Sequence, residues 1–234
     1  MDTNPSRMTS LTAGMLLIVA TVAALVSSAI ENPVLARTDY LTGVSGSATA
    51  MYAGGLAALI AAGTSVGIAI ALYPALKGWN AAMALGSVVF RTIEAVMYTI
   101  GAVSLLSLLT VGELFARAAT ADRASVQAIG DALVGVNHAS VLAGVFAFAV
   151  GAFMYYYVFY RSRLIPRWLS GWGIAGVLLM LGACLSALFT GNPVTSYTIL
   201  ILPIAVQEIL LAVWLIAKGF SSSALKPANT VLMA

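Results

Sequence analysis

Six segments of the chain are long and apolar enough to cross a lipid bilayer, and this feature limits the fold more than any other. A spanning helix needs roughly 20 mostly apolar residues to cross about 30 Å of hydrocarbon. The six segments cover residues 11–30, 50–76, 82–110, 136–160, 168–190 and 196–217. Lipid offers no partner to a free peptide group, so each segment should be an α-helix. The sequence therefore predicts an all-α polytopic membrane protein in which residues 1–234 form one bundle of six transmembrane helices.

The composition agrees with lipid as the solvent and excludes several kinds of site. The chain is 61% hydrophobic and only 8% charged, whereas soluble domains are about 45–50% apolar and about 25% charged. The single cysteine (Cys184) and single histidine (His138) exclude an internal disulfide and the usual Cys-rich or His-rich metal site. We therefore expect no metal and no cofactor. The net charge of +3 is spread as membrane topology requires, so we expect no nucleic-acid partner.

Lysines and arginines outside the six segments favour one orientation. With the N-terminus inside, seven fall on the cytoplasmic side: Arg7, Lys77, Arg161, Arg163, Arg167, Lys218 and Lys226. Three fall outside: Arg37, Arg117 and Arg123. Cytoplasmic loops carry the excess of basic residues, so we expect a multi-pass cell-membrane protein with both termini in the cytoplasm.

The first segment has an alternative interpretation as a secretory signal peptide. Arg7, the apolar run and the small residues Ser27, Ser28 and Ala29 fit that pattern. The run is long for a signal peptide, and the charge bias holds with the segment retained. We therefore expect it to be the first membrane span.

Two further patterns concern packing and the outer face. Residues 113–135 are more polar and carry apolar residues at helical spacing, which predicts a short helix at the outer interface between the third and fourth spans, or an extension of the fourth. Closely spaced small residues, such as Gly63 with Gly67 and Gly173 with Gly176, indicate close helix packing. That packing fits contacts within one chain, with a dimer seam as the alternative, and it leaves the oligomeric state open.

Three ionisable residues lie inside the predicted spans. Charges in a membrane cost about 2.5–3.5 kcal/mol each, so they usually face the bundle interior. Arg91 and Glu94 share a helix face because they are three residues apart, and Tyr98 lies one turn further along. Arg91 and Glu208 each lie ten residues from the cytoplasmic end of their span, which is about 15 Å at 1.5 Å per residue. The sequence predicts one buried polar cluster of Arg91, Glu94, Tyr98, Gln207 and Glu208.

This cluster has two interpretations, which lead to two hypotheses of function. In one, an Arg–Glu pair sets helix register without chemistry, and the protein is a structural or accessory membrane protein that acts through a partner. In the other, the unmatched glutamate serves a proton or cation site or anchors a polar ligand, and the protein is a small transport or ligand-binding bundle. The first predicts a sealed cluster, and the second predicts a water-accessible cavity that reaches it.

An enzyme is the weakest hypothesis. The chain has no GxSxG, HExxH, P-loop or dinucleotide-binding motif, and no serine or threonine stands beside a credible base. One histidine cannot supply paired axial haem ligands. The sequence therefore favours a protein without catalytic residues.

Four segments resemble a known family: 160–172 (YRSRLIPRWLSGW), 203–220 (PIAVQEILLAVWLIAKGF), 71–80 (ALYPALKGWN) and 90–109 (FRTIEAVMYTIGAVSLLSLL). In them the chain resembles the bacterial membrane proteins grouped as domain of unknown function 4386, over nearly all of its length except the outer loops and the tail. The resemblance implies a multi-span bacterial membrane protein. It implies no activity, substrate or cofactor.

The basic loop at residues 161–167 also allows two interpretations. Arg161, Arg163 and Arg167 could bind anionic lipid headgroups or an acidic partner. The positive-inside rule already accounts for these charges, and Pro166 suits the first turn of a helix. We therefore favour a topology determinant, with anionic lipid as the alternative partner beside the bilayer itself.

Overall fold

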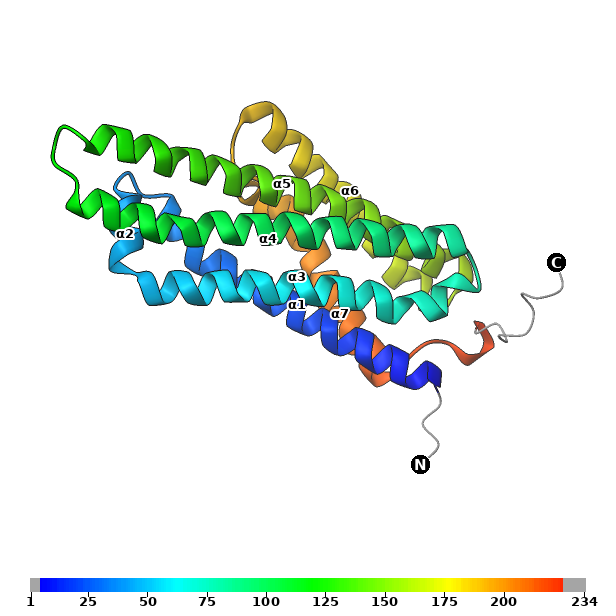
Figure 1. Cartoon of the computed structure of the whole chain (residues 1–234). Helices are drawn as coiled ribbons and strands as arrows, with labels where there is room; N and C mark the ends of the chain where they lie inside the picture. The colour runs from blue at the N-terminus through cyan, green and yellow to red at the C-terminus, as the bar shows by residue number, and fades with distance from the viewer. Residues whose placement is uncertain (1–4, 225–234) are drawn as a thin grey trace.

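The fold is a bundle of long helices. The structure is a computed structural model that describes residues 5–224. Within that range it contains seven α-helices, two short 3-10 helices and no β-strand (Figure 1). Six of the helices are long and apolar enough to cross a membrane. The prediction of an all-α polytopic protein with six spans is therefore confirmed.

The six long helices are α1 (Pro5–Leu35), α3 (Ala48–Lys77), α4 (Ala81–Arg117), α5 (Arg123–Ser162), α6 (Arg167–Thr190) and α7 (Thr198–Ala217). The short elements are α2 (Tyr40–Gly46), η1 (Val194–Tyr197) and η2 (Ser222–Ala224). Helices α1, α4 and α5 extend well beyond the apolar segments of the sequence, because helical residues continue past the hydrocarbon into more polar surroundings. Helices α3, α6 and α7 begin and end within two residues of theirs.

The separate short helix expected within residues 113–135 is absent from the described part of the chain. Residues up to Arg117 complete α4, and Arg123 begins α5. With 37 and 40 residues, these helices are about 55 and 60 Å long at 1.5 Å per residue, so both extend past a hydrocarbon layer of about 30 Å. The apolar spacing in this segment belongs to the ends of two long helices. The short extra helix of the fold is α2, which lies between the first and second spans.

The six long helices form a closed ring. Each packs against the next long helix in the chain, and α1 closes the ring by packing against α7. The start of α1 and the end of α7 lie at one end, called here the terminal end, with the α3–α4 and α5–α6 connections. The opposite, distal end carries α2 and the α4–α5 and α6–α7 connections (Figure 1).

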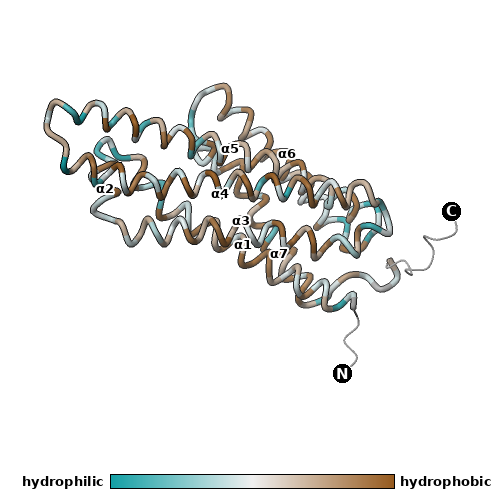
Figure 2. The backbone as a smooth tube through the Cα atoms, viewed as in Figure 1, coloured by the Kyte–Doolittle hydropathy of each residue, from teal (hydrophilic) through white to brown (hydrophobic). Residues whose placement is uncertain are grey.

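The outer surface of the ring is apolar, as a lipid-facing surface must be. Large exposed side chains occur on every long helix, among them Leu25, Leu56, Ile93, Phe146, Leu185 and Leu202. Figure 2 shows hydrophobic residues along the middle of the helices and hydrophilic residues gathered towards both ends. A soluble monomer rarely exposes apolar patches of this extent, so this surface supports membrane insertion.

The basic residues divide between the two ends as the topology predicts. Those at the terminal end are Arg7, Lys77, Arg161, Arg163, Arg167 and Lys218, and those at the distal end are Arg37, Arg117 and Arg123. Lys226, which the sequence analysis counts with the first group, lies outside the described residues.

The terminal end closes the ring tightly between α1 and α7. Arg7 donates hydrogen bonds from Nη2 to the Ile216 carbonyl (2.6 Å) and from Nη1 to the Leu215 carbonyl (3.3 Å). One helical turn of α7 thereby gains a donor for carbonyls that would otherwise lack one. Gly14 of α1 lies against the same turn, and a Cβ there would approach the Ala212 carbonyl oxygen to 2.9 Å. Only glycine permits this separation of the two backbones.

The distal end has its own small hydrophobic core. Helix α2 packs onto α4, and its buried residues Tyr40, Leu41 and Val44 join Leu105 and Leu108 of α4. The Tyr40 hydroxyl donates to the Asp131 carboxylate of α5 at 2.7 Å. Helix α2 is therefore held against both long helices.

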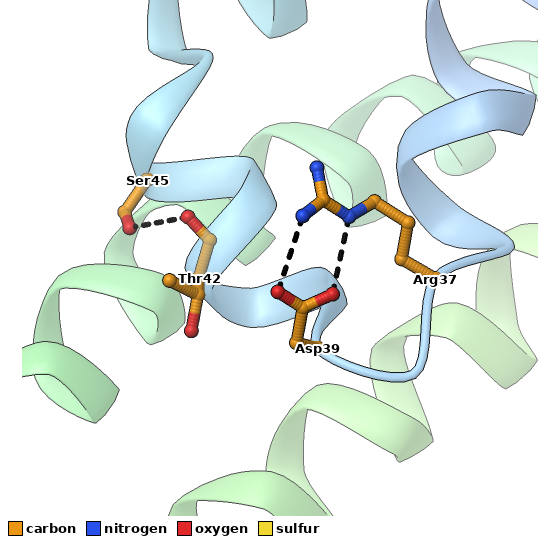
Figure 3. Close-up of polar contacts among 4 residues, drawn as sticks. All are labelled: Arg37, Asp39, Thr42 and Ser45. Atoms are coloured by element: carbon orange, nitrogen blue, oxygen red, sulfur yellow. Dashed lines mark hydrogen bonds and ion pairs between the residues drawn. The ribbon is translucent and has the colours of Figure 1, made fainter.

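The loop before α2 carries an exposed ion pair. Arg37 donates hydrogen bonds to both carboxylate oxygens of Asp39, at 3.1 and 3.2 Å (Figure 3). Nearby in α2, the Ser45 hydroxyl donates to the Thr42 carbonyl. The hydrogen bonds from Arg37 lower the pKa of the Asp39 carboxyl. Both side chains are more than half exposed, so we expect this pair to add little stability.

Candidate functional site: a central cavity with a polar floor

The ring of helices surrounds a partly open cavity of about 250 Å³, called here the central cavity. All six long helices contribute to its lining. Its polar floor, near the middle of the helices, consists of Thr21, Ser65, Arg91, Glu94, Tyr98 and Glu208. Small and apolar residues such as Ala24, Ala61, Val145 and Ile204 form the walls. Towards the distal end the lining becomes polar again at Ser28, Glu31, Asn137 and Thr195.

Arg91 lies on α4 with its charge enclosed by two other groups. Its side chain is 2% exposed, and its Nη1 lies 3.0 Å from Oε2 of Glu94. The guanidinium also lies over the ring of Phe148 from α5, 4.6 Å from the ring centroid, which is a favourable cation–π arrangement. Gly151 of α5 packs against the stem of Arg91, because a Cβ there would lie 3.4 Å from Arg91 Cγ.

Glu94 connects α4 with α3. Its Oε2 accepts a hydrogen bond of 2.7 Å from the Ser65 hydroxyl in addition to the ion pair with Arg91. A buried carboxylate is tolerated when it has both a counter-charge and a hydrogen bond. Ser65, Glu94 and Arg91 therefore form one continuous polar chain across the α3–α4 contact.

Glu208 approaches the same cavity from α7. The hydroxyls of Thr21 and Tyr155 lie beside its carboxyl group, and the charges of Arg91 and Glu94 act on it. None of the ion pairs within residues 5–224 joins Arg91 to Glu208. The structure thus brings the two residues to one cavity without direct pairing, because α4 and α7 belong to different parts of the ring.

Several polar atoms around the floor have no hydrogen-bond partner within residues 5–224. They are Thr21 Oγ1, Arg91 Nε, Tyr155 Oη and Glu208 Oε1. Arg91 Nη1 forms the ion pair with Glu94 and makes no hydrogen bond within this range. Buried polar groups are nearly always hydrogen-bonded in native proteins, and leaving one unsatisfied costs about 1–3 kcal/mol. The floor therefore offers a donor on Arg91 and an acceptor on Glu208, and the Thr21 and Tyr155 hydroxyls lie beside that acceptor.

The other predicted cluster residues divide between two places. Tyr98 lines the cavity with Arg91 and Glu94. Gln207 is also buried, but it accepts a hydrogen bond from the Tyr156 hydroxyl and donates to the Leu169 carbonyl at 2.9 Å. It therefore joins α7 to α5 and α6 and does not contribute to the cavity lining.

Three hydroxyl groups around the carboxylates are not predicted from the sequence: Thr21 and Ser65 at the floor, and Tyr155 beside Glu208. Thr21, Ser65 and Tyr155 stand in apolar stretches where a single hydroxyl is common, and no sequence spacing links them to Glu94 or Glu208. Only the closing of the ring brings three different helices together around the carboxylates.

The remaining predicted residues lie away from the cavity. At the terminal end, Arg161 lies in the last turn of α5, Arg163 in the α5–α6 connection and Arg167 at the start of α6. Within residues 5–224 no group of three His, Cys, Asp or Glu side chains could hold a metal ion.

The fold and the cavity together define a polytopic α-helical membrane protein: a ring of six spans around a polar-floored cavity. The family model described as Domain of unknown function (DUF4386) matches residues 12–219. The chain belongs to this family. Searches of curated proteins and of solved structures gave no match.

Proposed function

We propose that this protein is a small ligand-binding or transport bundle whose central cavity takes a mainly apolar molecule with a polar head. Two groups at the cavity floor carry this proposal: Arg91 Nε, which has no hydrogen-bond partner within residues 5–224, and the Glu208 carboxyl beside the hydroxyls of Thr21 and Tyr155. A head group that both accepts and donates hydrogen bonds would satisfy both residues at once, as a hydroxyl or a primary amide does. Pockets of this kind are mostly apolar, with a few placed polar groups that fix ligand orientation.

The size and shape of the lining support a small ligand with its head at the floor. The cavity of about 250 Å³ lies just below the usual range of about 300–1,000 Å³ for small-molecule sites. Its walls of alanine, valine and isoleucine suit a short hydrocarbon body. The polar residues at its distal side, Ser28, Asn137 and Thr195 among them, offer a hydrated route towards the floor.

We further propose that the distal end faces the outside of a cell membrane and that the termini are cytoplasmic. The excess of basic residues at the terminal end supports this orientation. Glu31, Asp39, Glu113, Asp122 and Asp131 belong to the distal end. A ligand would therefore enter the central cavity from the outer side.

A purely structural role for the cluster is the alternative. It requires that neighbouring side chains seal Arg91, Glu94 and Glu208 from water. Arg91 and Glu94 are almost completely buried, as this alternative requires. Their place in the cavity lining together with Glu208 supports ligand binding instead.

Three probes of matched size test the proposed head-group chemistry: 1-hexanol, methyl pentyl ether and n-heptane. At equal concentration in the detergent phase, the alcohol should raise the unfolding temperature most, because only the alcohol both accepts and donates. Glu208→Met removes the acceptor for the alcohol's hydrogen and should therefore remove its advantage over the ether. Glu113→Gln, an exposed acid outside the cavity, should leave the order unchanged. Equal shifts from all three probes in the wild-type protein would overturn the proposal.

A further inference from the structure

A second hollow, separate from the central cavity, lies at the terminal end between the α5–α6 connection and the end of α7. It has a volume of about 500 Å³ and includes the cations Arg163, Arg167 and Lys218 in its lining. We infer that this terminal hollow binds the phosphate of an anionic membrane phospholipid.

The backbone around this hollow is ordered by specific local features. Arg163 ends α5 in the left-handed region (φ 57°), and its N–H bonds the Phe159 carbonyl. Gly219 has a φ of 71° and turns the chain back after α7. The Ser221 N–H then donates to the Leu164 carbonyl at 2.9 Å. The α5–α6 connection and the segment after α7 are thereby fixed to each other, so the three cations face a built hollow.

The charge of the hollow is uncompensated within residues 5–224. None of the ion pairs in that range involves Arg163, Arg167 or Lys218, and the described acids all lie mid-membrane or at the distal end. Arg167 is oriented by the ring of Tyr160, 5.2 Å from its guanidinium carbon. An ordered guanidinium with neighbouring cations is the usual protein site for a phosphate group.

The depth of the hollow favours a lipid as the source of that phosphate. Trp214 lines the hollow, and Trp168, next to Arg167, is 58% exposed on the outer surface. Tryptophans of membrane proteins concentrate at headgroup level. An apolar wall of Leu164, Ile165 and Phe220 lies beside the charges, where the glycerol and first acyl carbons of a lipid would lie.

Native mass spectrometry of the purified full chain with dioctanoyl phosphatidylglycerol or dioctanoyl phosphatidylcholine tests this inference. The wild-type protein should retain phosphatidylglycerol in preference to phosphatidylcholine. Arg167→Gln with Lys218→Gln should weaken phosphatidylglycerol binding roughly tenfold or more, because a phosphate in the hollow would lose charge-assisted hydrogen bonds from both side chains. The matched control, Arg161→Gln with Lys77→Gln, removes two charges from the same end but outside the hollow. It should change binding by less than about twofold, because neither side chain can bond a phosphate held in the hollow.

Equal weakening by both double variants would overturn the site, because it would show a diffuse surface attraction. If millimolar inorganic phosphate displaced phosphatidylglycerol, the hollow would bind free phosphate, and the lipid would be ruled out as the source of the bound phosphate group. Arg167→Lys keeps the positive charge that the topology requires and loses only the planar guanidinium with its paired donors. This variant should fold normally but bind phosphatidylglycerol more weakly than the wild type does. Unchanged lipid retention in a folded Arg167→Lys with Lys218→Gln protein would also contradict the inference.

Discussion

Among single residues, Arg91 has the most connections within the buried cluster. It pairs with Glu94, lies over Phe148 and supports the close approach of Gly151. Its partner Glu94 also accepts a hydrogen bond from the Ser65 hydroxyl. The Arg91 and Glu94 side chains are almost completely buried. Each charge is therefore stabilised mainly by the other and only weakly by solvent.

We expect Arg91→Ala to destabilise the protein by about 3–5 kcal/mol, because it leaves the Glu94 carboxylate buried without a counter-charge. Unfolding in mixed detergent micelles measures this loss. Arg91→Ala combined with Glu94→Gln should recover part of the stability, since no unpaired charge then remains. A single Arg91→Ala variant as stable as the wild type would show that the pair does not support the fold.

The sequence predicts part of this cluster at the residue level. The spacing of Arg91 and Glu94 places both on one helix face, and the structure pairs them at 3.0 Å. Depth counting puts Glu208 at the same level but gives no rotation about the α7 axis. Gln207 and Glu208 are sequence neighbours that point to different surroundings, and only the packing of α7 against α6 and α1 separates them.

Among the helices, the contact between α1 and α7 closes the ring, and Gly14 permits it. An added Cβ would lie 2.9 Å from the Ala212 carbonyl oxygen and 2.8 Å from Ile216 Cγ1. The backbone cannot yield as a flexible side chain can, so α1 would have to move away.

We therefore expect Gly14→Ala to lower the unfolding temperature, with a loss of roughly 1–3 kcal/mol from overpacking. Gly63→Ala is the matched control, because it is also helical and an added Cβ there meets nothing within 4 Å. That change should be neutral or slightly stabilising, since alanine favours helix by about 1 kcal/mol over glycine. Equal effects of the two substitutions in thermal unfolding would argue against the close α1–α7 contact.

Helix α2 depends on the hydrogen bond from Tyr40 to Asp131. We expect Tyr40→Phe to cost about 0.5–1.5 kcal/mol, or more because the acceptor is charged, and to speed amide hydrogen exchange in α2. Asp39→Asn removes the exposed pair with Arg37 (Figure 3) and should leave exchange in α2 unchanged. If Asp39→Asn loosens α2 as much as Tyr40→Phe does, the surface pair contributes more than its exposure suggests.

Helix type and number are predictable from the sequence, but helix ends are less so. The apolar runs identify six spans because lipid requires them. The polar ends of α4 and α5 carry no such requirement, and their helical spacing also fits a short interfacial helix. The packing of these ends against each other and against α2, around Leu105 and Leu108, decides that they continue the long helices. This packing joins distant parts of the chain, so local sequence patterns do not predict it.

On the scale of the whole molecule, the ring explains why a cavity exists. Helix α1 packs beside α3 and α7, so the first and last spans complete a wall around the polar floor. Neither span length nor the charge bias predicts this closure. We propose that water reaches the floor of the cavity through its distal side.

The reactivity of a cysteine at position 21 towards an aqueous reagent measures this access. In a Cys184→Ala background, Thr21→Cys places a thiol at the cavity floor, Ser28→Cys places one nearer its distal side, and Leu17→Cys lies one turn from Thr21 but in the closed core. With methanethiosulfonate ethylammonium and the protein in lipid nanodiscs, we predict that positions 21 and 28 react and position 17 does not. A thiol at position 21 as unreactive as one at position 17, while position 28 reacts, would contradict a water-accessible floor.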